Sequence, residues 1–394
     1  MSKRKGIVYI DPQSYRNLSV YDYSLLTALR EYTDESITFF GSSCYDHLPL
    51  PDSIAFKPVF TYNHKKNAIV KALSYMWSYA HIIVYLMRRR PRLVHFQWFK
   101  LTPFDRRLLW LTAHLSNIRT IHTVHNLLPH DTGVRYQADY NHIYHTADCL
   151  IVHTQDTREQ LVAQFHISPA KVSIIPHGLL HIDVDEQLLS RNASHYEALY
   201  QTAGHTVFAA LGEQTVYKGI DLLADVWLST PELRNNPQLR LIVVGHQDSA
   251  IDLSRLAQCG NVVMSDRRIP NDEFCFLLRH TDVYLLPYRR ISQSGALLTV
   301  LSEQVPVLVS QVGGLCDPLR VADVGWSIRP NDPEALRSQL LHLAHNASEI
   351  SRIKSDTNAW QRIAAYYNWQ HIAQLTAKVY ETGRHVSSNT CSVL

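Results

Sequence analysis

The chain has 394 residues, enough for two domains with separate hydrophobic cores, and its composition is that of an ordinary globular protein. Its net charge of +3 conceals an asymmetry: residues 1–180 carry 20 Lys and Arg against 13 Asp and Glu, and the remainder carries 18 against 22. The six cysteines have none of the paired spacings of a zinc site or a disulfide framework. Only four apolar residues separate the basic run 3–5 from Asp11, too few for a signal peptide, so we expect a protein of the reducing cytosol.

Short apolar runs alternate with helical segments along the first half. This alternation is typical of a parallel sheet with crossover helices. No G-x-G-x-x-G motif follows the first strand, so the dinucleotide-binding fingerprint is absent. The pattern predicts strands at 6–10, 37–40, 92–96, 120–126, 148–153 and 172–176, and helices at 21–32, 68–87 and 158–165.

The run Ala68–Met87 is long enough to span a bilayer, but Lys71, His81 and several tyrosines and serines interrupt it. We interpret it as a crossover helix packed on the sheet, with a helix lying in the plane of a membrane as the alternative. No acidic residue lies between Ser53 and Phe104, whereas nine Lys and Arg do. The basic region 57–107 is either a solvated face or a surface attracted to anionic lipid head groups. Nucleic acid is not an expected partner, because no nucleic-acid-binding motif accompanies the charge.

The second half opens with a polar segment, 181–202, which we interpret as an irregular linker. Its Asp183-Val184-Asp185 triplet is of a type that holds a divalent metal under a diphosphate, but no strand precedes it, so we expect no metal site there. A second alternation of strands and helices follows. It predicts strands at 206–211, 239–244, 261–264, 283–286, 306–309 and 325–328. It also predicts a helix that ends at Trp227 and further helices at 272–279, 296–303, 332–344, 350–366 and 368–383.

The stretch Leu285–Leu315 combines a strand end, a small-residue turn at Ser292–Gly295 and a helix. A Ser-Gly turn that opens a helix leaves backbone N–H groups unpaired at the positive end of the helix dipole. Such a turn binds phosphate well, although an ordinary strand–helix turn has the same sequence. Lys218 lies in a glycine-flanked loop beyond another strand end, where its ammonium either reaches a phosphate or is simply solvated. His125 ends strand 120–126, at the edge where open α/β sheets bind ligands, and a structural role for it is equally open.

These two halves, with these particular loops, resemble the GT-B glycosyltransferases, specifically glycosyltransferase family 4. No single motif is specific, but the order and spacing of the set are. The motifs are TVHN at 123–126, IIPHG at 174–178, GEQTVYKG at 212–219, VVG at 243–245, DVYLLPY at 282–288, SGALL at 294–298, VPVLVSQVGG at 305–314 and the terminal NW helix. The resemblance implies two Rossmann-like parallel-sheet domains facing a cleft, 1–185 and 203–367, with residues 368–394 crossing back to the N-terminal domain.

The resemblance also implies a hexosyltransferase-type enzyme with a nucleotide-diphosphate sugar as donor, no metal or other cofactor, and retention at the anomeric carbon. The donor is expected on the C-terminal domain and a glycan or lipid-linked glycan acceptor on the N-terminal one. By position, Lys218 neutralises the diphosphate, and His125 lies near the transferred sugar; these are the expected catalytic residues. The other expected donor-binding residues are Gly212, Gly245, Ile269, Arg289, Gln293, Ser294, Gly295, Ala296, Thr299, His177 and Gly178.

Three departures from the family pattern keep other functions open. Glu213 stands where the family has an arginine, Ile291 and Thr299 stand at the two positions of a Glu-x7-Glu signature, and 12–17 replaces a glycine-rich first loop. We hypothesise that Arg289 or Arg290 supplies the missing positive charge. The leading interpretation is a transferase of bacterial polysaccharide assembly at the inner face of the plasma membrane. The alternatives are a sugar-nucleotide epimerase of similar shape and a catalytically weak binding or scaffold homologue.

Overall fold

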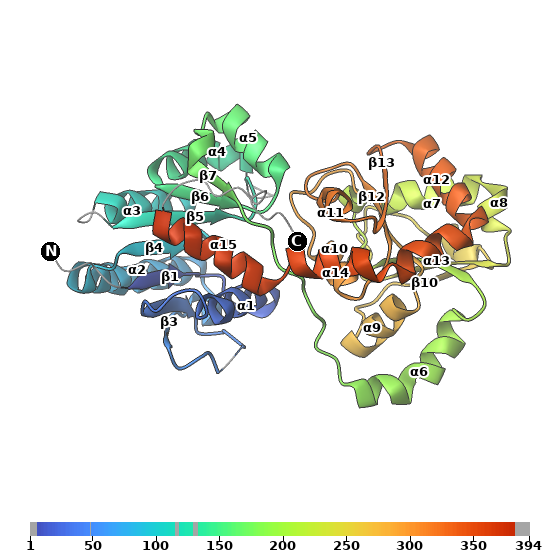
Figure 1. Cartoon of the computed structure of the whole chain (residues 1–394), viewed down its shortest axis with the longest axis horizontal. Helices are drawn as coiled ribbons and strands as arrows, with labels where there is room; N and C mark the ends of the chain where they lie inside the picture. Colours follow the sequence, from blue (N-terminus) through green and yellow to red (C-terminus); the bar gives the residue numbers. More distant parts are fainter. Residues whose placement is uncertain (1–5, 48, 115–117, 129–132, 383–394) are drawn as a thin grey trace. The chain divides into compact units, whose positions relative to one another are not determined.

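The computed structural model describes residues 6–47, 49–114, 118–128 and 133–382 (Figure 1). The chain forms two compact units. The first takes Met1–Gly178 and Tyr367–Leu394, and the second takes Leu179–Tyr366. Each unit is built on its own parallel sheet with its own hydrophobic core.

The first unit contains a seven-stranded sheet in the order β3-β2-β1-β4-β5-β6-β7, with all its strand pairs parallel. Successive strand residues face two separate cores, so that Val8 and Ile10 contribute to one and Ile7 and Tyr9 to the other. The strands are β1 (Ile7–Ile10), β2 (Ile37–Ser42), β3 (Ile54–Phe60), β4 (Leu93–Phe96), β5 (Arg119–Val124), β6 (Cys149–Val152) and β7 (Val172–Ile174).

Helices cover both faces of this sheet. One core is closed by α2 (Ala68–Arg89), α3 (Thr102–His114), α4 (Gly133–Thr146) and α5 (Gln155–Phe165). The other is closed by α1 (Ser19–Leu29) and by the last described helix, α15 (Trp369–Thr382), which packs on α1 (Figure 1). The prediction that the end of the chain crosses back to the N-terminal domain is therefore confirmed.

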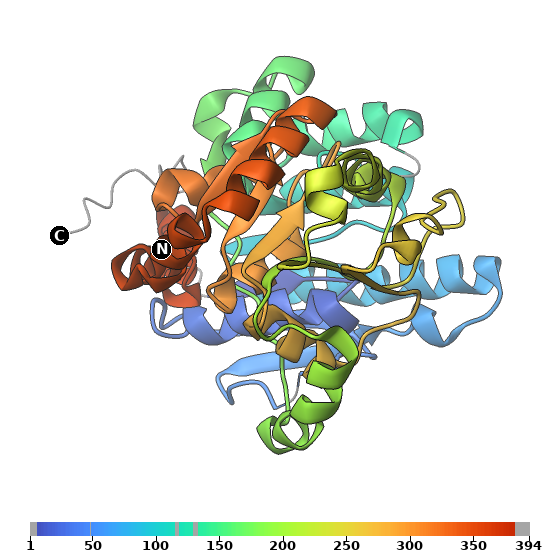
Figure 2. The ribbon, with the colours of Figure 1, turned by 90° about the vertical axis from the view of Figure 1, so that its right-hand side faces the viewer.

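The second unit contains a six-stranded parallel sheet in the order β10-β9-β8-β11-β12-β13, with helices on its faces (Figure 2). Its strands are β8 (Thr206–Leu211), β9 (Leu239–Val244), β10 (Val262–Ser265), β11 (Val283–Leu286), β12 (Val307–Ser310) and β13 (Gly325–Ile328). Its helices are α6 (Glu186–Tyr200), α7 (Ile220–Ser229), α8 (Pro231–Arg234), α9 (Asn271–Arg279), α10 (Gly295–Ser302), α11 (Asp317–Val321), α12 (Pro333–His345), α13 (Ala347–Ser355) and α14 (Thr357–Tyr366).

The prediction of an irregular linker at 181–202 is wrong, because this segment forms helix α6. The helix packs on α9, where the Tyr196 hydroxyl donates to a carboxylate oxygen of Asp272 at 2.6 Å. Its buried side chains, Leu189, Tyr196 and Tyr200, are too few to give a strong apolar period. Asp185 caps the helix by accepting the N–H groups of residues 187 and 188 at 2.9 and 3.1 Å, so the acidic triplet marks a helix start.

Besides α6, five helices and strands have no counterpart among the predicted ones: β3, α3, α4 and the short helices α8 and α11. The predicted helix 350–366 is also two helices, divided at Asp356, whose carboxylate accepts the N–H of Ala359 at 3.0 Å. Across the described part of the chain, every helix is too short or too polar to cross a membrane.

Candidate active site

The carboxyl ends of the parallel strands meet at one edge of the second sheet, and the predicted donor-binding loops lie along it. The loops beyond β8 and β9 contact each other through two glycines. Gly245 has a φ of +149°, and a Cβ there would lie 1.6 Å from the carbonyl oxygen of Gly212, which itself has a φ of +92°. Both positions therefore require glycine. The close contact between Gly245 and Gly212 fixes where the loops beyond β8 and β9 begin. The buried Gln214 side chain adds bonds to the carbonyl oxygens of Ala210 and Gly212 at 3.0 and 2.9 Å.

Lys218 lies at the end of the first of these loops. Gly219, which follows it, has a φ of +70°, and a Cβ there would lie 2.1 Å from the Pro287 carbonyl oxygen, so this loop packs against the one beyond β11. The Lys218 ammonium donates to the Glu213 carbonyl oxygen at 2.7 Å and lies 6.0 Å from the centre of the Tyr288 ring. Burial lowers the pKa of Lys218, and the negative charge of Glu213 opposes that shift. The Glu213 side chain is exposed.

The start of α10 forms the turn that the sequence predicted. Ser294 caps the helix, since its hydroxyl oxygen accepts the N–H of Leu297 at 3.3 Å. The amides of Gly295 and Ala296 have no hydrogen-bond partner among the described residues. Gly313 packs closely against the residues that precede the turn, since a Cβ there would lie 2.0 Å from the carbonyl oxygen of Ile291. Two backbone donors are thus left open in a braced turn at the positive end of a helix.

The two arginines beyond β11 have different roles. The Arg289 guanidinium binds both carboxylate oxygens of Asp221, at 2.7 and 2.8 Å, as well as the side chain of Asn331 and the carbonyl oxygen of Val216. Its positive charge is therefore used to hold the Lys218 loop to the start of α7. Arg290 is exposed and has no ion-pair partner within the described residues. Of the two candidates for the missing positive charge, Arg290 is the one available to a ligand.

The other predicted donor-binding residues of the second unit, Gln293, Ile269 and Thr299, lie near the same edge of its sheet. Gln293 is half-buried just before the turn, and Ile269 is half-buried in the loop between β10 and α9. The Thr299 hydroxyl donates to the Gly295 carbonyl oxygen at 3.0 Å inside α10, so it keeps only its acceptor capacity for a ligand.

His125 lies at the carboxyl edge of the first sheet, and both of its ring nitrogens have partners inside the protein. Nε2 is 2.9 Å from the side-chain oxygen of Gln97, and Nδ1 is 3.2 Å from Nε2 of His153. The ring stacks on Trp98 with centres 4.5 Å apart and meets the edge of Tyr21 at 5.0 Å. A side chain bound in this way holds its position but has no nitrogen left to act as a base toward a substrate.

Burial lowers the pKa values of the histidines around this position. Burial, followed by the charges of neighbouring histidines, lowers the pKa of His95 to about 3, and the pKa of His153 falls to about 3 in the same way. The pKa of His125 lies well below its ordinary value for the same reasons. His95 connects this cluster to the end of the chain, since its Nδ1 is 2.7 Å from the Tyr380 hydroxyl on α15. We call His95, Gln97, His125, His153 and Tyr380 the histidine network.

His177 and Gly178, predicted to line the site, pack on α15. The His177 ring lies 5.5 Å from the ring centre of Trp369, and its Nδ1 is 2.8 Å from the Gly178 carbonyl oxygen. A Cβ on Gly178 would lie 2.3 Å from the Trp369 indole, so glycine is required there for packing.

Comparison with known families decides what this pair of sheets is. Residues 39–180 match the family model described as Glycosyltransferase Family 4, and residues 205–346 match the model described as Glycosyl transferases group 1. Together the two matches cover more than half of the chain. The chain belongs to this glycosyltransferase family.

Individual relatives of this glycosyltransferase are distant. A D-inositol 3-phosphate glycosyltransferase of Corynebacterium diphtheriae is 25% identical over 69% of this chain and 67% of its own length. The phosphatidylinositol N-acetylglucosaminyltransferase GPI3 subunit of Saccharomyces cerevisiae is 22% identical over 71% of this chain and 61% of its own length. The chain thus matches about two thirds of each relative.

Solved structures match the whole fold. Sucrose-phosphate synthase of Thermosynechococcus elongatus has a TM-score of 0.67 at 19% identity, covering 96% of this chain and 98% of that one. Anabaena HepE, solved with UDP, has a TM-score of 0.67 at 13% identity, covering 96% and 100%. At these identities the likeness establishes the GT-B fold of the glycosyltransferase.

Sequence reasoning missed four members of the histidine network: His95, Gln97, His153 and Tyr380. For Gln97 and His153 a signal was present in the sequence. Gln97, His125 and His153 are each the first residue after a strand, following β4, β5 and β6. In the parallel register Val124 pairs with Val152, so His125 and His153 lie side by side. Phe96 pairs with His122, so Gln97 lies level with Thr123, two residues before His125. Comparing strand ends, rather than motifs, would have found them.

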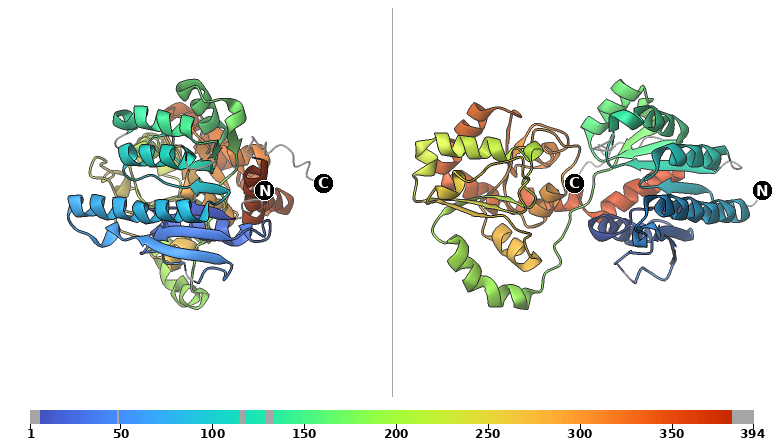
Figure 3. Two further views of the ribbon diagram at one scale, coloured as in Figure 1. Left: turned by 90° about the vertical axis from the view of Figure 1, so that its left-hand side faces the viewer. Right: turned by 180° about the vertical axis from the view of Figure 1, so that it is seen from behind.

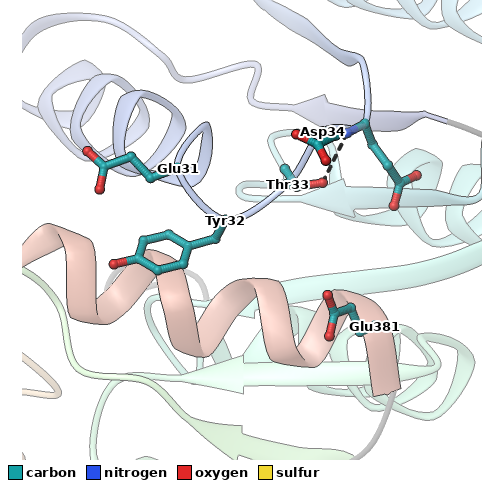
Figure 4. Close-up of a pocket in the computed structure, with 6 residues that line it drawn as sticks. Glu31, Tyr32, Thr33, Asp34 and Glu381 are labelled. Carbon is teal, nitrogen blue, oxygen red and sulfur yellow. Dashed lines mark hydrogen bonds between the residues drawn. The ribbon is translucent and has the colours of Figure 1, made fainter.

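An acidic hollow of about 490 Å³ lies elsewhere in the first unit of the glycosyltransferase, between the 31–35 turn and the end of α15 (Figure 4). Glu31, Asp34, Glu35 and Glu381 line it. The hollow lies beside the start of β2, at the amino edge of the sheet, and Arg92 already pairs with Glu35. Among the described residues no group of His, Cys, Asp and Glu is arranged to hold a metal ion.

Proposed function

We propose that this glycosyltransferase moves a sugar from a nucleotide-diphosphate sugar to a hydroxyl of a glycan or lipid-linked glycan. We further propose that transfer retains the anomeric configuration, needs no metal, and serves bacterial polysaccharide or glycoconjugate synthesis. The observation that carries the donor assignment is the turn before α10. It leaves the amides of Gly295 and Ala296 open at the same sheet edge as the Lys218 ammonium.

The chemistry of transfer explains why such a turn is useful. The bond between the anomeric carbon and the phosphate oxygen breaks, and negative charge develops on the departing diphosphate. Backbone N–H groups held in place by Gly313 and a lysine held by its loop need little reorganisation to stabilise that charge. The acceptor hydroxyl forms the new bond to the same carbon, and in front-face attack its proton passes to the departing phosphate oxygen.

This scheme requires no side-chain nucleophile or base. It agrees with the bonded state of His125, whose two nitrogens are occupied by Gln97 and His153. His125 is then a positioning residue that fixes the shape of the sugar-facing edge of the first unit.

The relatives give the proposal its direction. HepE has been solved with UDP, with UDP and glucose, and with UDP-glucose. The names of two relatives specify D-inositol 3-phosphate and phosphatidylinositol, so their substrates carry a phosphate and, in the second, a lipid. A nucleoside diphosphate sugar and a polar or lipid-linked hydroxyl acceptor are therefore the substrate classes to test first.

A panel of nucleotide sugars and free nucleoside diphosphates tests the donor assignment. A donor that binds the folded protein raises its melting temperature by mass action, and we expect slow release of free sugar from one of them. Lys218→Gln should lose both effects, whereas the exposed Lys378→Gln on α15 should keep them. Interconversion of two nucleotide sugars without release would instead establish an epimerase, and binding without either reaction would establish a scaffold.

A further inference from the structure

Helix α2 is apolar on two opposite sides. Tyr75, Tyr79, Ile82 and Leu86 are buried in the core of the first unit, as expected of a crossover helix. Other large apolar side chains of the same helix are exposed, with Ile69 at 71%, Trp77 at 68% and Leu73 at 56% of their full accessibility. Packing on the sheet accounts for the first set only.

The exposed side chains form one continuous stripe. Residues 69, 73, 77, 84 and 87 are exposed and apolar, and at about 100° per residue they fall within an arc of roughly 80°. The buried residues 75, 79, 82 and 86 are centred about 150° away from the centre of this arc. We call the stripe Ile69, Leu73, Trp77, Val84 and Met87 the outer face of α2. A helix of a globular protein normally presents polar side chains in this direction.

The neighbouring helix α3 also carries exposed apolar side chains. The first turn of α3 is tied to α2 by the Tyr75 hydroxyl, which donates to Asp105 at 2.7 Å, and both helices close the same core. On α3, Trp110 and Leu111 are exposed. Figure 3, left, shows α2 and the helix next to it running along the outside of the first sheet.

Positive charge surrounds the outer face without compensation. The exposed basic residues there have no ion-pair partner among the described residues, and the sequence has no acidic residue between Ser53 and Phe104. They are Lys65, Lys66 and Lys71 before or on the first turn of α2, Arg88, Arg89 and Arg90 at its end, and Arg107 on α3.

We propose that the outer face of α2, together with Trp110 and Leu111, docks this protein onto the surface of an anionic lipid bilayer. An exposed apolar stripe flanked by Lys and Arg, with tryptophan among its apolar residues, is the chemistry of a helix lying in the interface. A second copy of the chain is a poor occupant, because pairing the two faces would bring two sets of unpaired cations together. The helix lies on the bilayer, since α2 is not apolar enough to cross it.

Co-sedimentation of the full-length protein with vesicles tests this proposal, with phosphatidylcholine vesicles compared against vesicles containing about one third phosphatidylglycerol. We expect at least tenfold stronger partition to the anionic vesicles at low salt and a marked loss at 0.5 M salt, because salt screens exposed charges. Leu73→Gln with Trp77→Gln should weaken partition at least tenfold. The matched control is Leu188→Gln with Leu199→Gln, two exposed leucines of α6, and it should leave partition unchanged.

A second pair of variants separates charge from apolar contact. Arg88→Gln with Arg89→Gln should reduce partition to anionic vesicles several-fold, whereas Arg255→Gln with Lys378→Gln, equally exposed elsewhere, should not. Thermal melts confirm that each variant is folded. Equal partition to neutral vesicles, absence of partition, or a concentration-dependent dimer abolished by the Trp77 change would each overturn the proposal. None of these measurements needs a nucleotide sugar, so failure here is distinct from failure of the donor assignment.

Discussion

At the carboxyl edge of the first sheet the side chains beyond the strands bind one another, whereas at the same edge of the second sheet backbone donors and a lysine remain open. The first edge is built from His125 and its neighbours, each with partners inside the unit. The second is built from glycine loops, the free amides of Gly295 and Ala296, and Lys218. Both edges are the usual ligand-binding edge of a parallel sheet.

The two edges represent two different kinds of binding site. A satisfied polar network is rigid and presents a fixed shape, while open backbone donors present unused charge. Under the proposed function, the first edge would select the acceptor by its shape, and the second would stabilise the departing diphosphate. The following predictions test this contrast, beginning with the largest expected effect.

The Lys218 change should have the largest effect. If the second edge stabilises the departing diphosphate, Lys218→Gln should lower the transfer rate about 100-fold or more, because one preorganised donor to a developing anion has a typical value of that size. The melting temperature should change little, since the ammonium makes one hydrogen bond to a carbonyl oxygen. If the Lys218→Gln variant turned over within threefold of the wild type, the second edge could not be said to stabilise the departing diphosphate through this lysine.

The two adjacent arginines should separate binding from stability. Arg290→Gln should weaken donor affinity about tenfold without changing the melting temperature, because its guanidinium is exposed and unpaired in the described structure. Arg289→Gln should lower the stability of the fold by about 1 kcal/mol, because it breaks a half-exposed pair with Asp221. Isothermal titration and thermal melts measure the two effects, and the reverse pattern would contradict the assignment.

The histidine network should respond to acid. The pKa values of His95 and His153 are about 3 in the folded protein, far below the value of about 6.5 for an unfolded chain. The unfolded state therefore binds more protons below pH 6.5, so their stabilisation is complete above that pH and is lost as pH falls from about 6.5 toward 3. His153→Gln should make the fall in melting temperature between pH 7 and pH 5 shallower.

The comparison of slopes isolates the histidine. Buried carboxyls such as Asp105, whose pKa is raised to about 7 by burial, give the opposite pH dependence but are shared by both proteins. Replacing the exposed His114 with Gln should leave the slope unchanged. In transfer assays His153→Gln should lower kcat several-fold, with no new pKa in the rate profile, because His125 is positioned by the network and is not a base.

The smallest effect is expected at Thr299. Its hydroxyl donates inside α10, so a ribose hydroxyl is left with an acceptor only. Thr299→Val should change the donor KM by no more than about threefold, and Thr299→Ser should restore it. A tenfold change in the donor KM would show that the Thr299 hydroxyl contributes more to donor binding than the open amides of Gly295 and Ala296 do.

Much of this arrangement was accessible from sequence because parallel strands bring their ends together. The alternating pattern predicted the two parallel sheets. The order and spacing of the loop motifs, among them those of Gly212, Gly245 and Ser294, gave the resemblance that implied the GT-B architecture. What escaped prediction depends on partners distant in sequence. The pairing of Arg289 with Asp221 joins positions 68 residues apart, and no local pattern encodes it.

The missed elements have local physical reasons. Strand β3 lies at the sheet edge, exposes much of its length and contains Pro58, so it lacks the apolar run of a central strand. Helix α2 was correctly located and interpreted as a crossover helix, with a helix in the plane of a membrane as the alternative. From its apolar composition alone, a helix with one buried apolar side cannot be told from a helix that is apolar on two sides. The exposure of Trp77 and Leu73 in the structure shows that α2 is the second kind.

Helix α15 has a consequence for biosynthesis. Its side chains, among them Ile372, Leu375 and Val379, complete a core that begins with the first strand. The ribosome must therefore make all of the second unit, residues 179–366, before the first can finish its interior. At roughly 5–20 residues per second the nascent N-terminal sheet waits about ten seconds or longer with one side covered by α1 but not by α15, while the contiguous second unit is free to fold first.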